Sequence, residues 1–117
     1  MKILVVDDNR DAADSLVLLL GMKGYETFAA YGGPEAVALA DAQKPDVVLL
    51  DIGMPQMSGY DVVRELRHHS RQPRPRIYAL TAYTQVSDRI AAKQAGFDGH
   101  LAKPVDLEVL LEMLRRI

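Results

Sequence analysis

The sequence predicts an α/β protein in which five strand–helix pairs form a three-layer, doubly wound (βα)5 arrangement around one parallel sheet. Two observations carry this prediction. Short apolar runs alternate with helix-like patterns along the chain, and the connections between them are short. The apolar run at residues 47–50 also contains no polar residue, which is typical of a strand that is covered on both faces, as strands in parallel sheets are.

Size and composition are those of one ordinary globular domain. The chain has 117 residues, of which 49% are hydrophobic and 26% are charged. A chain of this length can bury roughly two-thirds of the surface that it exposes when unfolded, which is enough for one core. We therefore expect a single domain over residues 1–117.

The first strand–helix pair is expected near the start of the sequence. Residues 3–6 are apolar and rich in β-branched side chains, so we expect a strand there. The pattern then predicts a helix over residues 8–24, with Asp8 as a candidate cap and with Gly21 and Gly24 as stop signals. Four apolar residues of this helix are spaced so that they share one face: Ala12, Leu16, Leu19 and Leu20.

The middle of the chain repeats the pattern. Residues 25–29 predict a second strand, and a helix is expected to begin at Gly33-Pro34 because proline is favoured in a first helical turn. Residues 47–50 form the third strand, and Ser58 is expected to cap a helix that runs to about residue 68.

Two more pairs complete the prediction. Residues 77–80 form a fourth strand, and a short helix over residues 87–96 follows it. Residues 99–102 form a fifth strand, and Asp106 is expected to cap the last helix. The apolar face of that helix consists of Leu107, Leu110, Leu111 and Leu114.

Charge and cysteine content exclude several classes of protein. The net charge is −2 and there is no cysteine, so the chain offers neither a thiolate or disulfide site nor a broad basic surface for nucleic acid. Carboxylates at positions 7 and 8 interrupt the first apolar run too early for a signal peptide, and no apolar run approaches transmembrane length. We expect a cytoplasmic protein with no membrane insertion and no direct nucleic-acid contact.

One stretch of the sequence is basic. We interpret it as a solvated loop between a helix and a strand, with phosphate or nucleic-acid contact as the less favoured alternative, because the rest of the chain supplies no matching basic face. Its basic residues are Arg67, His68, His69, Arg71, Arg74 and Arg76, with Pro73 and Pro75 among them.

Polar residues follow four of the five predicted strands. In an open parallel sheet, ligands bind outside the carboxyl ends of the strands, so side chains at these positions converge on one edge. The residues that follow the second strand, Ala30 and Tyr31, add nothing to the set. The converging residues are Asp7 and Asp8 after the first strand, Asp51 after the third, Thr81 after the fourth and Lys103 after the fifth.

Three crowded carboxylates require a compensating cation. Hard carboxylate oxygens favour Mg²⁺, with Mn²⁺ as the alternative ion. Asp51 is the natural nucleophile because its strand should be central, and a carboxylate can form an aspartyl phosphate directly. The Lys103 ammonium and the Thr81 hydroxyl would then stabilise the transferring phosphoryl group. Each of these residues alone would be an ordinary turn, cap or surface residue, so the prediction depends on their joint placement.

These motifs resemble those of the receiver domain of bacterial two-component response regulators, the CheY-like family, and the resemblance runs from end to end. It implies a flavodoxin-like fold with strand order 2-1-3-4-5. In order and at this spacing the motifs are highly specific. They are residues 3–8 (ILVVDD), residues 51–59 (DIGMPQMSG), residues 79–82 (ALTA) and Lys103-Pro104.

The resemblance implies a role for each converging residue. Asp51 would be the phosphoacceptor, and its donor would be a phosphohistidine on a sensor histidine kinase or a histidine phosphotransfer protein. The domain would assist its own phosphorylation and slow dephosphorylation without being an enzyme in the usual sense. The Lys103–Pro104 bond is commonly cis in the family. The ligands implied for Mg²⁺ are Asp8, Asp51 and the backbone carbonyl of Gly53, with Asp7 acting through water, while Thr81 moves towards the phosphoryl group and Lys103 contacts it.

One position departs from the family pattern. The family's switch aromatic lies three residues before the lysine, and here that residue is His100. In the family this ring turns inward when the threonine moves, which reshapes the face of helix four, strand five and helix five that meets the effector. Histidine can rotate too, but it titrates near neutrality. His100 is therefore either an exposed strand-end residue or a switch that makes the output depend on pH between about 6 and 7.

Three other functions compete with a signalling switch as interpretations of the sequence. A phosphohydrolase of the haloacid dehalogenase type has a second aspartate two residues after the nucleophile, where this chain has Gly53. A flavin or dinucleotide binder lacks its Gly-x-Gly-x-x-Gly motif after the first strand. A degenerate receiver would lose an acid, the threonine or the lysine, and all are present here. The output stays open, since the chain could be a stand-alone regulator or a receiver excised from a hybrid kinase or larger regulator.

Overall fold

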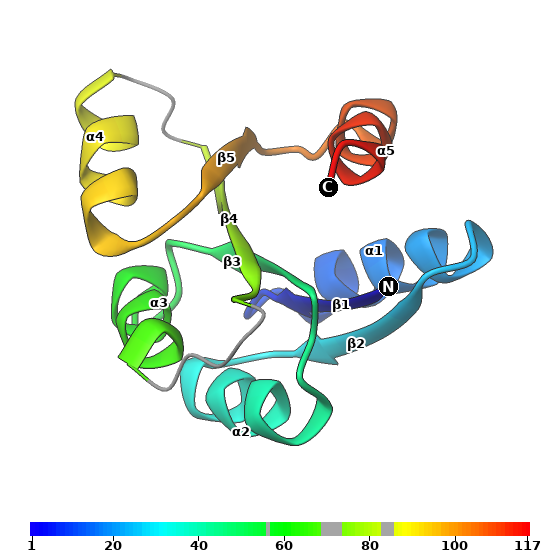
Figure 1. The fold of residues 1–117 in the computed structure, drawn as a ribbon, viewed down its shortest axis with the longest axis horizontal. Helices are drawn as coiled ribbons and strands as arrows, with labels where there is room; N and C mark the ends of the chain where they lie inside the picture. The colour runs from blue at the N-terminus through cyan, green and yellow to red at the C-terminus, as the bar shows by residue number, and fades with distance from the viewer. Residues whose placement is uncertain (56, 69–73, 83–85) are drawn as a thin grey trace.

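The computed structural model of the protein describes residues 1–55, 57–68, 74–82 and 86–117. Gln56 of the second motif and His69, Arg71 and Pro73 of the basic stretch lie outside these ranges. Strands and helices alternate along the chain (Figure 1). The elements are β1 (Lys2–Val6), α1 (Arg10–Met22), β2 (Glu26–Ala30), α2 (Gly33–Gln43), β3 (Val47–Asp51), α3 (Gly59–His68), β4 (Arg76–Thr81), α4 (Val86–Ala95), β5 (Gly99–Ala102) and α5 (Leu107–Arg115).

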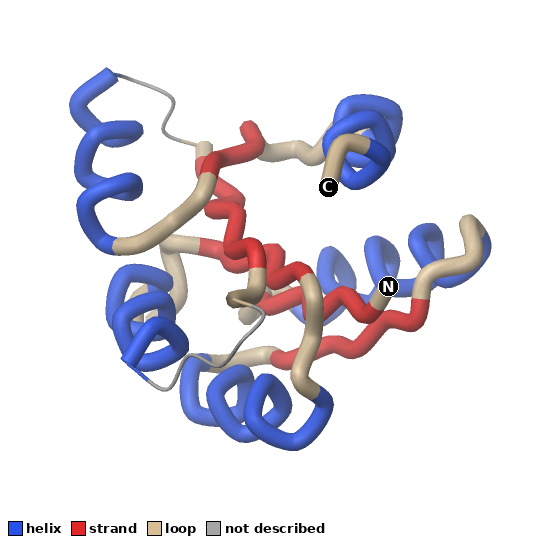
Figure 2. Tube along the Cα trace, viewed as in Figure 1, coloured by secondary structure: helices blue, strands red, loops and turns tan. Residues whose placement is uncertain are grey.

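The strands form one parallel sheet in the order β2-β1-β3-β4-β5, which confirms the predicted fold class and strand order. The sheet lies between two helical layers (Figure 2). Helices α2, α3 and α4 cover one face, and α1 and α5 cover the other (Figure 1). The central strand β3 is buried at all five of its residues, as its uninterrupted apolar run predicts.

Two apolar cores, one on each face, hold the layers together. Successive side chains of a strand point to opposite faces, so β1 sends Leu4 and Val6 to one core and Ile3 and Val5 to the other. The first core joins the sheet to α2, α3 and α4 through residues such as Ala36, Val62, Leu66, Ala92 and Phe97. The second joins it to α1 and α5 through Ala13, Leu20, Leu110, Leu111 and Leu114.

Helix α1 differs from its prediction in two ways. It begins at Arg10, and its cap is Asn9, whose side chain accepts a hydrogen bond from the Ala12 N–H at 3.1 Å, so the expectation that the helix starts at Asp8 is wrong. The predicted apolar face is also wrong at Ala12 and Leu19, which are exposed. The apolar run in this helix covers a wide arc, so spacing alone could not say which part faces the sheet. The residues that face it are Ala13, Leu16, Val17 and Leu20.

The predicted caps of two other helices are confirmed. Ser58 and Asp61 cap α3 reciprocally: the Ser58 hydroxyl accepts from the Asp61 N–H at 3.4 Å, and the Asp61 carboxylate accepts from the Ser58 N–H at 3.2 Å. The Asp106 carboxylate accepts from Glu108 N–H at 2.9 Å at the start of α5. No helix in the described part of the chain combines the length and the apolar character needed to span a membrane.

Candidate functional site: an acidic pocket at the carboxyl edge of the sheet

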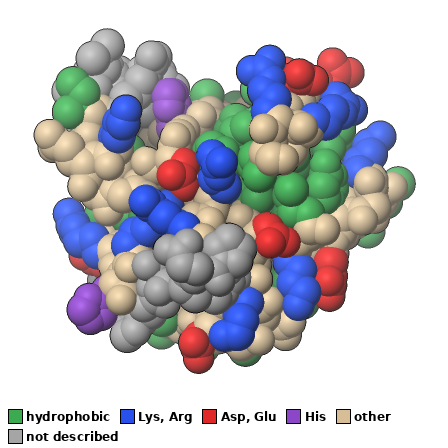
Figure 3. All heavy atoms as spheres, in the orientation of Figure 1, with side chains coloured by type: hydrophobic (Ala, Val, Ile, Leu, Met, Phe, Trp, Pro, Cys, Tyr) green, Lys and Arg blue, Asp and Glu red, His purple; other side chains and the backbone are tan. Residues whose placement is uncertain are grey.

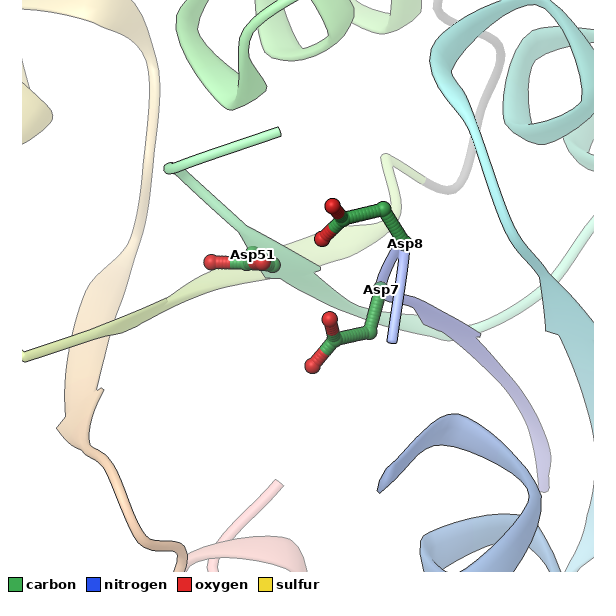
Figure 4. Close-up of side chains that lie close together, drawn as sticks. All are labelled: Asp7, Asp8 and Asp51. Atoms are coloured by element: carbon green, nitrogen blue, oxygen red, sulfur yellow. The ribbon is translucent and has the colours of Figure 1, made fainter. Parts of the chain in front are cut away.

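Three carboxylates meet at the carboxyl ends of β1 and β3. These strands are neighbours with Val6 opposite Leu50, so the residues that come next, Asp7 and Asp51, are adjacent. One carboxylate oxygen from each of Asp7, Asp8 and Asp51 lies within 4.8 Å of the others. Figure 4 shows Asp7 and Asp8 projecting from the end of β1 towards the side on which Asp51 lies. Asp7 is only 3% exposed and Asp51 6%, whereas Asp8 is exposed to solvent.

Backbone groups fix the two buried carboxylates. The Asn9 N–H donates to Asp7 Oδ1 at 3.0 Å, and the Gly53 N–H donates to Asp51 Oδ1 at 3.1 Å. Helix α3 begins directly behind Asp51, where the Gly59 N–H donates to the Ile52 carbonyl at 3.0 Å. A Cβ on Gly59 would lie 2.6 Å from the Asp51 carbonyl oxygen, so only glycine permits this approach. The loop after β3 therefore holds Asp51 in one orientation.

Lys103 enters the pocket from the end of β5. Its Nζ lies 3.2 Å from Asp7 Oδ2 and 3.5 Å from Asp51 Oδ2, so it contacts the carboxylate oxygens that the backbone N–H groups leave unoccupied. The Lys103 N–H also donates to the Thr81 carbonyl at 2.9 Å, which extends the β4–β5 pairing by one residue. The Lys103–Pro104 peptide bond is cis, as the family resemblance implied.

The pocket shifts the pKa values of two of its groups. Burial raises the pKa of Asp51 above that of an ordinary aspartate, and the nearby Asp7 raises it further, although the Gly53 N–H and Lys103 act in the opposite direction. Partial burial would lower the pKa of Lys103, but the Asp51 and Asp7 carboxylates outweigh it and the pKa of the ammonium is raised. Lys103 is therefore charged at neutral pH.

The donor set fits a hard divalent cation. Three carboxylates face a single ammonium, so negative charge is in excess within a partly buried space. Crowded carboxylates of this kind are stabilised by a cation, and an all-oxygen set suits Mg²⁺. Receiver domains bind Mg²⁺ at such an aspartate cluster, and Asp7, Asp8 and Asp51 form one here. Gly53 lies next to this cluster through its hydrogen bond to Asp51.

The remaining predicted residues lie on the neighbouring strands. Thr81 is the last residue of β4 and is buried, beside Asp51 at the end of β3, because Asp51 pairs with Leu80. His100 lies on β5 opposite Ala79, three residues before Lys103, and is half-buried. It borders a groove between the β5 edge and α5, and Figure 3 shows an apolar area beside α5.

The sequence interpretation missed contacts made by Tyr31. Its hydroxyl donates to the Asp14 carboxylate of α1, and the Arg10 guanidinium lies 4.2 Å from the centre of its ring. The Asp7 N–H donates to the Ala30 carbonyl at 3.1 Å, so the end of β2 is tied to the edge of the pocket as well. These side-chain contacts are made to α1 and not to the pocket, so they do not contradict the prediction that Ala30 and Tyr31 add nothing to the converging set. No spacing motif links an arginine at position 10 with a tyrosine at position 31.

The interpretation of the basic stretch is wrong at one residue. Arg67 is not solvated: its side chain is 14% exposed and binds Asp98 at 2.7 Å. Arg74 and Arg76 are exposed, as the interpretation requires. A partner 31 positions away could not be identified from the sequence, where Arg67 is one of several arginines in the same basic stretch.

Comparison with known proteins places the chain in a family. It matches the family model of the response regulator receiver domain over residues 3–115, and it belongs to that family. The family acts as a phosphoacceptor signalling module that works with histidine kinases and effectors in two-component systems, so the predicted class of function is confirmed.

Curated relatives and solved structures agree with this assignment. The response regulator MprA of Mycobacterium avium is 41% identical over 117 residues, which is all of this chain and 50% of that protein. The chain thus spans about half the length of the curated relatives it matches. The chemotaxis protein CheY4 of Vibrio cholerae, 34% identical, superposes with a TM-score of 0.92 over 99% of this chain and 97% of that one. A response regulator of Burkholderia pseudomallei with a phosphorylated aspartic acid and a calcium ion is 34% identical and superposes with a TM-score of 0.84. That superposition covers 94% of this chain and 64% of the other.

Proposed function

We propose that Asp51 accepts a phosphoryl group in a Mg²⁺-dependent reaction and that this modification switches the domain. The observation that carries the proposal is the position of Asp51, a buried carboxylate at the end of the central strand with a lysine ammonium 3.5 Å away and two further aspartates beside it. The phosphorylated aspartic acid in the Burkholderia pseudomallei relative supports the same chemistry here.

Each converging residue has a stated part in the reaction. Asp51 attacks phosphorus through a carboxylate oxygen, the bond from phosphorus to the donor imidazole nitrogen breaks, and that nitrogen keeps the electron pair. Lys103 and the Thr81 hydroxyl stabilise the charge on the phosphoryl oxygens. Asp8, Asp51 and the Gly53 carbonyl would hold Mg²⁺, or Mn²⁺ in its place, with Asp7 acting through water. The ion supplies further charge neutralisation.

The partners are proposed from the same chemistry. The donor is a phosphohistidine on a sensor histidine kinase or a histidine phosphotransfer protein in the cytoplasm. Thr81 moves towards the phosphoryl group, and His100 takes the place of the family's aromatic in passing the change to the surface of α4, β5 and α5. An effector of unidentified class binds there, and the groove bordered by His100, Val109 and Met113 belongs to that surface.

The test is direct phosphorylation of the protein. Incubation with Mg²⁺ and acetyl phosphate or phosphoramidate should give a base-labile phosphoryl adduct that intact-mass measurement detects on the wild type. Asp51→Asn should lose it, and Asp61→Asn, which changes an exposed aspartate of α3, should keep it. If the wild type gives no adduct with any donor, Asp51 is not a phosphoacceptor. If it hydrolyses phosphate esters rapidly, a phosphohydrolase is the better description.

A further inference from the structure

A second charged cluster lies at the amino end of β5, at the opposite edge of the sheet from the acidic pocket. At its centre is Arg67, in the last turn of α3. Its guanidinium donates three hydrogen bonds, one to the residue just before β4 and two to the connection between α4 and β5. The acceptors are the Gly96 carbonyl at 3.0 Å, the Pro75 carbonyl at 2.7 Å and Asp98 Oδ2 at 2.7 Å.

Asp98 extends the pairing of β5 with β4 beyond the first residue of the strand. The Ile77 N–H donates to Asp98 Oδ2 at 2.8 Å, and the Asp98 N–H donates to the Ile77 carbonyl at 2.7 Å. The carboxylate thus takes the place that a backbone carbonyl of β5 would have. Because β5 has four residues and pairs only with β4, these bonds form a large share of what attaches it to the sheet.

The backbone near Arg67 is shaped to admit its side chain. Gly96 has φ +119°, a conformation that other residues rarely adopt, and a Cβ there would lie 3.1 Å from Arg67 Cγ. Burial lowers the pKa of the guanidinium, and Asp98 opposes that shift. The pair is thus partly removed from water and linked by a charge-assisted hydrogen bond, which is much stronger than a surface ion pair.

The other end of β5 is fixed by the Lys103 N–H to the Thr81 carbonyl. The register between these two ends decides where Lys103 emerges, since a slip of one residue moves every side chain of a strand to the other face. We propose that Arg67 and Asp98 are positioning residues that hold β5 in register and thereby keep the Lys103 ammonium at Asp7 and Asp51. The proposal rests on the proposed function, in which Lys103 contacts the phosphoryl group.

The test is a double-mutant cycle between the two ends of β5. Beryllofluoride is the phosphoryl mimic, and its affinity is measured at saturating Mg²⁺ for the wild type, Arg67→Ala, Lys103→Ala and the double variant. Arg64→Ala is the matched control, because Arg64 lies on the same helix in an exposed ion pair with Asp61. Arg67→Lys and Asp98→Asn are milder variants that guard against a failure to fold.

Three results are expected together. Arg67→Ala should weaken beryllofluoride binding by about tenfold, or ~1.4 kcal/mol, and should add little once Lys103 is already alanine. The affinity of Arg67→Ala for Mg²⁺ should stay within about twofold of the wild-type affinity, because the aspartates that would hold the ion come from β1 and β3 and not from β5. Amide hydrogen exchange of residues 99–102 in the metal-free protein should be faster in Arg67→Ala than in Arg64→Ala, with Arg67→Lys and Asp98→Asn between them.

Other results would overturn the proposal. If Arg67→Ala binds beryllofluoride as tightly as Arg64→Ala does, Arg67 does not act on the pocket. If the losses of affinity in Arg67→Ala and Lys103→Ala multiply in the double variant, Arg67 does not act through Lys103. If the wild type itself does not bind beryllofluoride, it is the proposed function that fails. The exchange measurement then still decides whether Arg67 fixes β5, and unchanged exchange refutes it.

Discussion

The charged clusters at the two edges of the sheet differ in how far their negative charges are matched by positive ones. At the carboxyl edge, three carboxylates share one ammonium. At the amino edge, the Arg67 guanidinium binds the Asp98 carboxylate at 2.7 Å, and Arg74 is a second cation near enough to lower the pKa of Arg67. At the amino edge the carboxylate is already paired with a cation and acts on the pocket only by fixing β5, whereas the three carboxylates at the carboxyl edge have negative charge left for a cationic ligand. The difference separates a structural link from a binding site without reference to any motif.

The largest expected effect comes from removing the ion pair between Arg67 and Asp98. Arg67→Ala removes this ion pair, after which the Asp98 carboxylate keeps, among the described residues, only the hydrogen bond from the Ile77 N–H, and it also removes hydrogen bonds to two carbonyls. The free energy of unfolding should therefore fall by about 2–4 kcal/mol. Urea denaturation at pH 7 measures the change. Arg64→Ala removes an exposed ion pair and should cost less than about 0.5 kcal/mol. Equal losses in the two variants would mean that the amino-edge cluster is no stronger than a surface pair.

The next largest effect is the stabilisation of the folded protein by Mg²⁺ bound at the three carboxylates of the pocket. Mg²⁺ at 100 times its dissociation constant should raise the free energy of unfolding by about 2.7 kcal/mol relative to the protein with chelator, because it binds only the folded state. Asp8→Asn should lose most of this gain and the exposed Asp61→Asn should keep it. Thermal unfolding with and without Mg²⁺ measures both. If Mg²⁺ raises the free energy of unfolding of Asp8→Asn as much as that of the wild type, Asp8 is not part of the metal site.

A smaller effect is expected when one of the three crowded carboxylates is replaced in the absence of metal. The raised pKa of Asp51 means that the folded protein holds this proton more tightly than the unfolded chain does, so the ionised carboxylate costs stability. With chelator present, Asp51→Asn should therefore be more stable than the wild type at pH 7.5. The difference should shrink as the pH falls from above the folded-state pKa of Asp51 to its lower unfolded value. A less stable variant at pH 7.5 would mean that the contact with Lys103 outweighs burial.

The smallest effect tests the contacts beside the pocket. Tyr31→Phe removes the hydrogen bond to Asp14 and leaves the ring beside Arg10. Because this hydrogen bond is exposed, the urea midpoint should move no further than it does in Arg64→Ala. A shift as large as that of Arg67→Ala would add Tyr31 to the groups that hold the fold together.

Patterns that depend on burial alone were predictable from the sequence. The apolar run of β3 indicated a central parallel strand, and Leu110, Leu111 and Leu114 of α5 were placed correctly because Glu108 and Glu112 mark the opposite side of that helix. In α1 the apolar residues cover too wide an arc, so Leu16 and Leu20 were placed correctly but Ala12 and Leu19 were not. Asp8 and Asn9 are both good caps, and the sequence could not show which one faces the first turn.

The candidate site was predictable as a set of residues but not as an arrangement. Strand ends converge in any parallel sheet, which is why Asp7, Asp8, Asp51 and Lys103 could be expected together. Arg67 and Tyr31 could not, because their partners come from distant segments and obey no fixed spacing. The roles of all the site residues stay predictions, since those of Thr81 and His100 concern a phosphorylated state and that of Gly53 concerns a bound metal ion.

The contact between Lys103 and Asp7 joins residues that are 96 positions apart. During synthesis, the three carboxylates are present once β3 has emerged, but the ammonium arrives only after β5 has been made. The ammonium therefore cannot reach the carboxylates until β1 and β5 are both in place in the sheet. The contact between Lys103 and Asp7 thus reports that the first and the last strand have joined the same sheet.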